Sequence, residues 1–600
     1  MANKFISMRN LKFLLYEVFD VGSLTKYPFF ADHSREVFDL VLDTAMKMGR
    51  GLLFPAFTEM DRKPPVFENG KVKVHPVVRE LMKQVGEGGW IGAHTSYEQG
   101  GQQMPNSILA VFRTIFAAAN YSAAVYPFLT TGAAHLIASF GSDELKKTYL
   151  GKMYSGKWQG TMALTEPQAG SSLTDLATTA FPADQGWYKL KGQKIFISCA
   201  DYDGIENVVN LLIARIQGAP LGIKGVSLFV VPKLRPENGK LVPNDILCTT
   251  IYHKLGYRGA PITQLSLGEN GDCRGWLVGE PHKGIRYMFQ MMNEARIDVG
   301  MSAAAIASAA YYAALDYARE RPQGRKITEK DPSVPQIPII NHADIKRMLL
   351  FQRAVVEGAL CLNLQCAKYI DLSLVLAGED KERAELLLDL LTPVAKSYPS
   401  EMGILAVSQG LQCLGGYGYC DEFPLEQYYR DVRIHAIHEG TTGIQGMDLL
   451  GRKIVMKQGK AFLLYLDEVG KAIAGAKADA QLAAQAEALA EALEKLKQVT
   501  TRLTGFALKN QIELFLADAT VFLELFGIIT IAWQWLLQAM VANKALAGNP
   551  GESEANFYQG KLQTFRYFFA YELTKIEGLS RTLLQADGVC MEMKTEWFED

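Results

Sequence analysis

The sequence predicts an α+β protein in which helical and β segments are segregated along the chain. Two long stretches with apolar residues at three- and four-residue spacing flank a central stretch of short β-branched and aromatic runs. Helices, then strands, then helices is the order of an α+β chain. At 600 residues the chain is too long for a single core, so we expect several domains.

The first helical stretch gives two parts. Residues 1–40 form an N-terminal segment with an amphipathic pattern. Residues 41–159 form an N-terminal helical domain, because apolar residues recur at helical spacing at its start and Ala-rich runs surround residues 116–124.

The rest of the chain divides into three domains. Residues 160–283 contain short strands separated by Gly, Pro, Asn and Asp, and a small β-barrel is their natural closure. Residues 284–455 are helical with many small residues, which predicts a closely packed four-helix-bundle domain. Residues 456–600 form an additional C-terminal helical domain, in which the Ala-rich residues 470–494 predict one long helix.

One uncharged stretch, residues 525–543, is near the length of about 20 residues that a membrane span requires. Thr530, Gln534 and Gln538 interrupt it, and no comparable stretch accompanies it. We therefore predict a buried helix and no integral membrane segment, with docking to a membrane surface as the alternative.

Composition excludes several classes of function. The net charge is −2, from 62 basic and 64 acidic residues, so nothing indicates a nucleic-acid partner. The eight cysteines lack a CxxC pair or a zinc spacing, which is typical of reduced thiols and indicates no metal site. The N-terminus lacks the apolar region of a secretory signal, so we expect a cytoplasmic protein.

The chemistry is concentrated in two motifs. Glu439 follows Tyr429-Arg430-Asp431 and precedes a Gly-Thr-rich turn. Alone, this pattern also fits a helix that ends at Gly440 with Glu439 in solvent. A second motif lies far upstream, Thr165-Glu-Pro-Gln-Ala-Gly-Ser171. Because two independent motifs then indicate a functional site, we favour a functional Glu439 over a solvated helix end.

Together these motifs resemble the acyl-CoA dehydrogenase family of flavoenzymes over about residues 40–450. Further matches lie between them in the family's order: Lys194–Ser198, Asn293–Arg296, Ala318–Arg321, His342 and Gln412–Gly418. The additional C-terminal domain resembles that of the enlarged branch, which includes very-long-chain and 3-methylthiopropanoyl-CoA dehydrogenases. In that branch the extra domain covers the face that smaller members use to form a dimer of dimers, so we expect a homodimer.

The resemblance implies that FAD is the cofactor and that Glu439 is the base. In the family this glutamate removes the α-proton of an acyl-CoA thioester, and the β-hydrogen leaves as hydride to flavin N5. Such a base needs a dry site that raises its pKa above the reference value of about 4.3. Some members carry the glutamate immediately before the arginine that corresponds to Arg296. Here that position is Ala295, and Glu294 is a rival one residue earlier.

The resemblance also implies the ligand contacts. The flavin-binding positions are Met162, Leu164, Thr165, Ser171, Phe196, Ser198, Arg321, Gln412, Gly415, Gly416, Thr441 and Thr442. The substrate-binding positions are Ser171, Met292, Asn293, Arg296 and Gly440. Arg321 corresponds to an arginine that reaches the flavin pyrophosphate across the dimer interface. The family's Phe-Gly after it is replaced by Gln323-Gly324, and the usual Gln after His342 is Ala343.

The expected activity is dehydrogenation of an acyl-CoA, with electrons passing to an electron-transferring flavoprotein or a similar carrier. Two alternatives remain open: an acyl-CoA oxidase that uses O₂, and a non-catalytic relative that keeps FAD but binds nucleic acid. The sequence does not indicate the length or shape of the acyl chain, because pocket depth depends on side chains from distant helices.

Overall fold

The computed structural model describes residues 4–183 and 186–599, without the side chains of residues 289–292. It divides into two compact units. Asp32–Ala295 is called here the barrel unit, and Met1–Ala31 together with Arg296–Asp600 is called the helical unit. Each unit is described by itself.

The helices of the barrel unit surround a long buried helix. They are α2 (Arg35–Met48), α3 (Phe57–Arg62), α4 (Val77–Glu87), α5 (Asn106–Phe140) and α6 (Asp143–Tyr154). Ser34 and Ser142 cap α2 and α6 by accepting hydrogen bonds from backbone N–H groups of the first turn. Within α5, Asn120 leaves the helical conformation, and its amide donates to the carbonyl of Leu53 at 3.2 Å.

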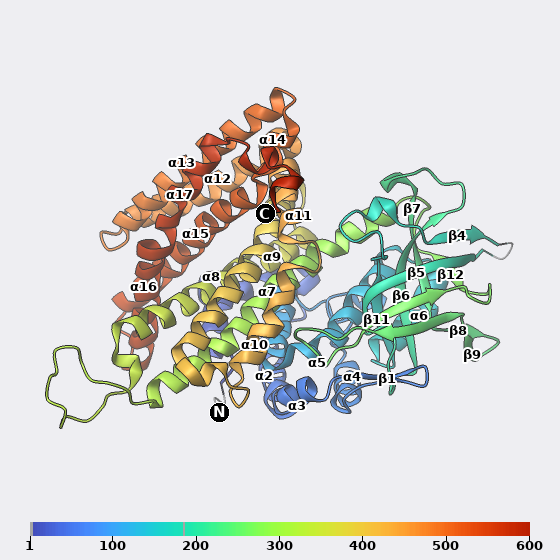
Figure 1. Ribbon diagram of the computed structural model, residues 1–600, viewed down its shortest axis with the longest axis horizontal. Helices are drawn as coiled ribbons and strands as arrows, with labels where there is room; N and C mark the ends of the chain where they lie inside the picture. The colour runs from blue at the N-terminus through green and yellow to red at the C-terminus, as the bar shows by residue number, and fades with distance from the viewer. Residues whose placement is uncertain (1–3, 184–185, 600) are drawn as a thin grey trace. The chain divides into compact units, whose positions relative to one another are not determined.

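The strands of this unit close into a ring (Figure 1). The main sheet contains β3 (Trp158–Ala163), β4 (Thr179–Pro182), β5 (Tyr188–Ser198), β6 (Asn207–Ile216), β7 (Val226–Pro232), β10 (Ile246–Ile251), β11 (Ile262–Leu267) and β12 (Arg274–Leu277). Strand β4 pairs with both β5 and β6, while β12 and β7 connect β5 to β6 on the other side. Two small hairpins, β1 (Val66–Glu68) with β2 (Lys71–Lys73) and β8 (Leu234–Glu237) with β9 (Lys240–Pro243), are separate. The predicted small barrel is confirmed.

Long helices build the core of the helical unit. They are the part of α7 (Gly284–Glu320) after Ala295, α8 (Ala343–Val375) and α9 (Gly378–Leu414), followed by the shorter α10 (Leu425–Val432) and α11 (Thr442–Asp448). Small residues allow these helices to approach closely, as predicted. A Cβ added at Gly300 of α7 would lie 1.8 Å from the carbonyl oxygen of Ala395 in α9.

The C-terminal extension is entirely helical. It consists of α12 (Met456–Lys477), α13 (Ala483–Leu508), α14 (Ile512–Ala517), α15 (Ala519–Ala547), α16 (Glu552–Tyr567), α17 (Ile576–Gln585) and α18 (Val589–Glu592). The prediction of one long helix over residues 470–494 was wrong. A turn at residues 478–482 separates α12 from α13, because Asp479 accepts hydrogen bonds from backbone N–H groups that would otherwise continue the helix.

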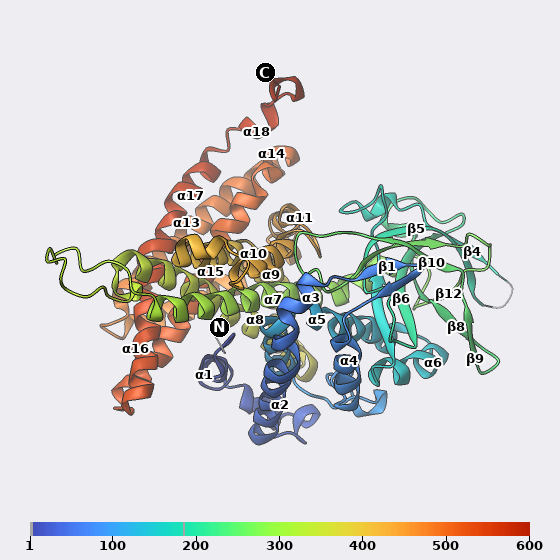
Figure 2. The same cartoon turned by 60° about the horizontal axis from the view of Figure 1, so that its bottom comes forward.

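The apolar stretch at residues 525–543 lies in α15, which packs between α8 and the other helices of the extension (Figure 2). Trp535 donates from Nε1 to the carbonyl of Ala354 at 3.0 Å, and Gln534 donates to the side chain of Gln365 at 2.6 Å. The expectation that no comparable stretch accompanies this one was wrong, because α5 is also long and apolar enough to cross a membrane. In the protein, 94% of the apolar window of α5 and 78% of that of α15 are buried. Packing therefore accounts for the apolar composition of α15, as the buried-helix prediction requires.

The N-terminal segment is anchored to this extension. After α1 (Met8–Lys12), the side chains of Phe13 and Leu14 are fully buried. Arg9 forms an ion pair with Glu554 at 2.6 Å, and the buried ammonium of Lys561 binds the side chains of Asn10 and Glu357. The two ends of the chain are thus parts of one helical unit.

Candidate functional site

Glu439 occupies a strained turn between a 3₁₀ segment, Arg433–Ala436, and helix α11. Its φ is +53°, in the left-handed region that residues with a Cβ seldom adopt, and Gly440 follows with φ +88°. Thr441 then caps α11 by accepting a hydrogen bond from the backbone N–H of Ile444. A strained carboxylate-bearing residue, held by its surroundings, is typical of a functional site.

Two buried side chains bind the carbonyl oxygens of this turn. Lys396 of α9 donates from Nζ to the carbonyl of Gly440 at 2.8 Å, and Gln445 of α11 donates to the carbonyl of Glu439 at 3.1 Å. Among the described residues, nothing accepts a hydrogen bond from the backbone N–H of Glu439 or Gly440. The turn therefore keeps two N–H donors beside its carboxylate.

The surroundings of Glu439 favour its protonated form. Burial raises the pKa of the Glu439 carboxyl, and the positive charges of Arg296 and Lys396 lower it by a smaller amount. Arg296 is 2% exposed and pairs with Asp448 at 2.8 Å, which offsets its charge. Burial also lowers the pKa of Lys396 to about 8. A carboxyl with a raised pKa is suited to accept a proton from a weak carbon acid.

The rival carboxylate, Glu294, has the opposite environment within the barrel unit. It pairs with Nδ1 of His135 on α5 at 3.1 Å. Burial raises the pKa of Glu294, but the neighbouring His135 outweighs this effect and lowers it to about 2. His135 thus favours the ionised form of Glu294, which makes Glu294 a weaker base than Glu439.

The Thr165-Glu166-Pro167 motif continues β3 of the barrel. Its backbone is fixed because the carbonyl of Leu164 accepts from Nζ of Lys194 at 3.0 Å and that of Thr165 accepts from the N–H of Ile195 at 2.9 Å. Lys194 also forms a fully buried ion pair with Glu166 at 2.7 Å. The side chains of Met162, Leu164 and Thr165 remain half-buried at this strand end.

Three further predicted flavin positions belong to the barrel unit. Phe196 near the end of β5 has φ +57°, which turns its ring out of the strand so that 57% of it is exposed, against Tyr252 at 4.8 Å between centroids. Ser198 is half-buried, and its carbonyl accepts from the hydroxyl of Thr161 at 2.6 Å. Ser171 is exposed. The barrel unit therefore brings β3 and β5 together around Met162, Thr165 and Phe196, while Ser171 stands in the loop beyond them.

The predicted adenosine-side positions lie in the helical unit. Arg321 follows α7, and its guanidinium lies 5.8 Å from the ring centroid of Tyr417. It has no carboxylate partner among the described residues. Gly415 ends α9 with φ +59°, and a Cβ at Gly415 or Gly416 would meet nothing within 4 Å. Gln412 is exposed in the last turn of α9. Arg321 and the Gly415-Gly416 loop are thus linked through Tyr417.

The remaining predicted positions differ in whether their side chains are free to contact a ligand. The hydroxyl of Thr442 is bound to the carboxylate of Glu401, so it is already engaged. Asn293 is half-buried in α7, and Met292 lies outside the side chains that the structure describes.

Comparisons with known proteins agree with this arrangement. Four family models match successive segments: the acyl-CoA dehydrogenase N-terminal domain at residues 55–157, the middle domain at 161–269, the C-terminal domain at 282–454, and an acetyl-CoA dehydrogenase C-terminal-like domain at 465–594. A butyryl-CoA dehydrogenase of Syntrophomonas wolfei is 34% identical, with 99% of both chains covered. The chain belongs to the acyl-CoA dehydrogenase family.

Two other matches define the branch and the fold of the dehydrogenase. A 3-methylmercaptopropionyl-CoA dehydrogenase of Ruegeria pomeroyi is 37% identical over 86% of this chain and 87% of its own. The crystal structure of an acyl-CoA dehydrogenase complexed with FAD from Bacillus anthracis superposes with a TM-score of 0.74, at 22% identity, over 98% of this chain and 93% of that one. The last family model covers the extension, so the dehydrogenase has the additional domain of the enlarged members.

FAD is the cofactor of this dehydrogenase, and the chain's own features fit it. The exposed aromatic ring of Phe196 beside the half-buried Thr165 is a surface that a planar ring system can cover. Arg321 carries a positive charge that no carboxylate of the described chain neutralises, as a pyrophosphate requires. Gly415 and Gly416 leave open space where side chains would otherwise stand.

Sequence reasoning missed the residues that hold the dehydrogenase's strained turn, Lys396 and Gln445. A lysine within the apolar run Leu390–Tyr398 is the one signal that pointed to Lys396, since a fully buried ammonium needs a specific partner. Gln445 had no signal of its own, because its role depends on the backbone conformation of Glu439.

Proposed function

We propose that this dehydrogenase converts an acyl-CoA thioester to the 2-enoyl-CoA, with Glu439 as the base that removes the α-proton. The observation that carries the proposal is the turn itself: a carboxyl whose pKa burial raises, next to two backbone N–H donors that have no acceptor in the described part of the chain. A thioester α-proton is a weak acid, so its removal requires both a base and donors for the charge that develops on the carbonyl oxygen.

The division of labour within the turn follows from its hydrogen bonds. Lys396 and Gln445 bind the carbonyl oxygens of Gly440 and Glu439, which fixes the conformation of the turn. The N–H of Gly440 shares a trans peptide group with the Glu439 carbonyl, so it points to the opposite side of that group. We assign the N–H of Glu439 to the thioester carbonyl and the Glu439 carboxylate to the α-proton. Bound FAD supplies the acceptor for the β-hydrogen, which leaves as hydride.

For the cofactor, we propose contacts from Met162, Leu164, Thr165, Phe196 and Ser198 on the ring side. On the phosphate and adenosine side we propose Ser171, Arg321, Gln412, Gly415 and Gly416. Thr441 and Thr442 complete the set, although Thr441 caps α11 and the Thr442 hydroxyl is bound to Glu401, so both would contribute mainly by shaping the turn.

For the substrate, we propose Ser171, Met292, Asn293 and Gly440 as contact positions. Arg296 is committed to Asp448, so we assign its influence to its charge, which lowers the pKa of Glu439. We further propose that a homodimer passes its electrons to an electron-transferring flavoprotein or a similar carrier, and that the enzyme is cytoplasmic. The two curated relatives act on butyryl-CoA and 3-methylmercaptopropionyl-CoA, which makes short acyl chains the first substrates to test.

An anaerobic titration of the FAD-loaded enzyme tests the proposal. Adding butyryl-CoA, 3-methylthiopropanoyl-CoA and longer or aromatic thioesters in turn should bleach the flavin absorbance with at least one of them. No bleaching with any thioester would reject dehydrogenation. Rapid reoxidation of the reduced enzyme in air would instead indicate the oxidase alternative.

A further inference from the structure

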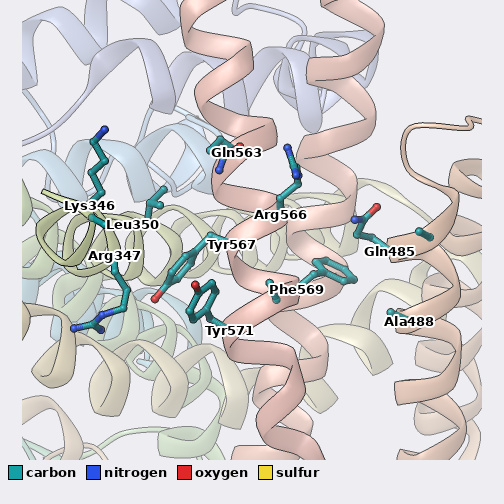
Figure 3. Close-up of a pocket in the computed structure, with 13 residues that line it drawn as sticks. Lys346, Arg347, Leu350, Gln485, Ala488, Gln563, Arg566, Tyr567, Phe569 and Tyr571 are labelled. Atoms are coloured by element: carbon teal, nitrogen blue, oxygen red, sulfur yellow. The ribbon is translucent and has the colours of Figure 1, made fainter. Parts of the chain in front are cut away.

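The helical unit contains a cleft that none of the proposed flavin or substrate residues lines. It has a volume of about 670 Å³, within the range of small-molecule sites. Its walls are the start of α8, the start of α13, and the end of α16 with the π-helical turn Phe568–Glu572 (Figure 3). Two of the three walls belong to the C-terminal extension, so the cleft exists only in an enlarged chain.

The charge of this cleft has one sign. Lys346, Arg347 and Arg566 line it, and no aspartate or glutamate does. Arg347 is held at the rim by Asp344 at 2.8 Å. Lys346 and Arg566 have no carboxylate partner among the described residues. Two uncompensated cations in one concave site favour an anionic ligand.

The floor of the cleft is aromatic. The rings of Tyr567 and Tyr571 are stacked, with 4.7 Å between centroids and 11° between planes. Tyr567 and Phe569 are buried, whereas 54% of Tyr571 is exposed. Figure 3 shows the tyrosine pair between Arg347 and Phe569, with the Arg566 side chain above. The exposed ring of Tyr571 offers a flat surface to another planar ring, and arginine can pair with phosphate in a bidentate manner.

We propose that this cleft binds a nucleoside diphosphate group, with its base against Tyr571 and its phosphates between Lys346 and Arg566. A simple anion would leave the aromatic floor unused, and an apolar ligand would leave two cations unpaired. The same group occurs in free ADP and at the nucleotide end of coenzyme A. The proposal does not depend on the reaction assigned to Glu439, although the coenzyme A count described below rests on the proposed function, because it includes one molecule at the active site.

Equilibrium dialysis with the FAD-loaded, full-length enzyme tests the site with ADP, pyrophosphate and adenosine as separate probes. ADP should bind saturably at one site per chain and more tightly than either fragment. Arg566→Glu should weaken ADP binding by about tenfold or more, the effect of losing one charged hydrogen bond. Tyr571→Ala should weaken ADP binding but leave pyrophosphate binding unchanged.

Arg581→Glu is the matched control, because Arg581 is an exposed arginine of α17 outside the cleft, and the substitution changes net charge equally. If Arg581→Glu and Arg566→Glu weaken ADP binding equally, the effect comes from net charge alone and the proposal fails. It also fails if ADP does not bind saturably, or if pyrophosphate binds as tightly as ADP. If Arg566→Glu changes the sedimentation mass instead, the cleft is a protein contact and the proposal fails.

A count of coenzyme A sites separates the two sources. If the cleft accepts the nucleotide end of coenzyme A, the wild type should bind two molecules per chain and Arg566→Glu one. If only free ADP fits, the wild type and Arg566→Glu should each bind one molecule of coenzyme A per chain. The wild type should still bind ADP more tightly than Arg566→Glu does. Both results support a nucleoside diphosphate site.

Discussion

Replacing Lys396 with methionine tests how the strained turn works. The substitution keeps a side chain of similar length in a fully buried place but removes the ammonium that binds the Gly440 carbonyl at 2.8 Å. Hydrogen bonds of charged groups contribute about 1.5–3 kcal/mol. If this free energy is lost only in the transition state, the rate of flavin reduction falls by about 10- to 160-fold.

The same variant should also shift the pH dependence. Lys396 lowers the pKa of Glu439, so its removal raises that pKa further. The base acts only when deprotonated, so the rate should be lost at a higher pH in the variant than in the wild type as the pH falls. A purely structural defect would lower the rate without shifting the acidic limb of the pH–rate profile, the pH range in which the rate is lost.

Anaerobic stopped-flow reduction by a substrate thioester, measured across pH, gives both quantities. Lys561→Met is the matched control, because Lys561 is equally buried but binds Glu357 of α8 and Gln538 of α15, away from the turn. We expect Lys561→Met to lower the thermal stability and leave the pH limb in place. An unchanged rate and limb in Lys396→Met would refute the role of Lys396 in positioning the turn.

Three further predictions concern the base, its rival and the extension. Glu439→Gln should retain FAD, seen by its absorbance, and lose about 10²- to 10⁴-fold in reduction rate, because the amide cannot accept a proton; a wild-type rate would place the base elsewhere. Glu294→Gln should reduce flavin within a few-fold of the wild type, while a loss equal to that of Glu439→Gln would exchange their roles. Deleting residues after Lys457 should give insoluble protein, since α15 buries several large side chains worth on the order of 1.5–3 kcal/mol each; a soluble truncated protein with wild-type reductive kinetics would contradict this expectation.

The order of helices and strands was predictable because each depends on local patterns. The runs that became β5, β6 and β7 carry β-branched residues between turn residues. The glutamines within the apolar stretch of α15 indicate a buried helix instead of a membrane span. The break at Asp479 was missed because helix propensity over an Ala-rich stretch outweighs one capping residue when only composition is considered.

The candidate site was predictable only in part, since its chemistry depends on contacts between distant segments. The motif identified Glu439, but a Glu-Gly pair also fits an ordinary helix end, and only the backbone shows φ +53°. Likewise, nothing near Glu294 in the sequence points to His135, which is 159 positions away and decides its protonation. Proximity in the chain could not supply these partners.

The anchoring of the N-terminal segment affects the order in which the chain can fold during synthesis. Asn10 meets Lys561, and Arg9 meets Glu554, so the helical unit cannot be completed until nearly the whole chain has left the ribosome. The barrel unit is continuous from Asp32 to Ala295 and can fold much earlier, because domains generally fold as units during synthesis. Through most of translation, the ring of Phe13 therefore lacks Phe557 of α16, against which it packs in the complete helical unit.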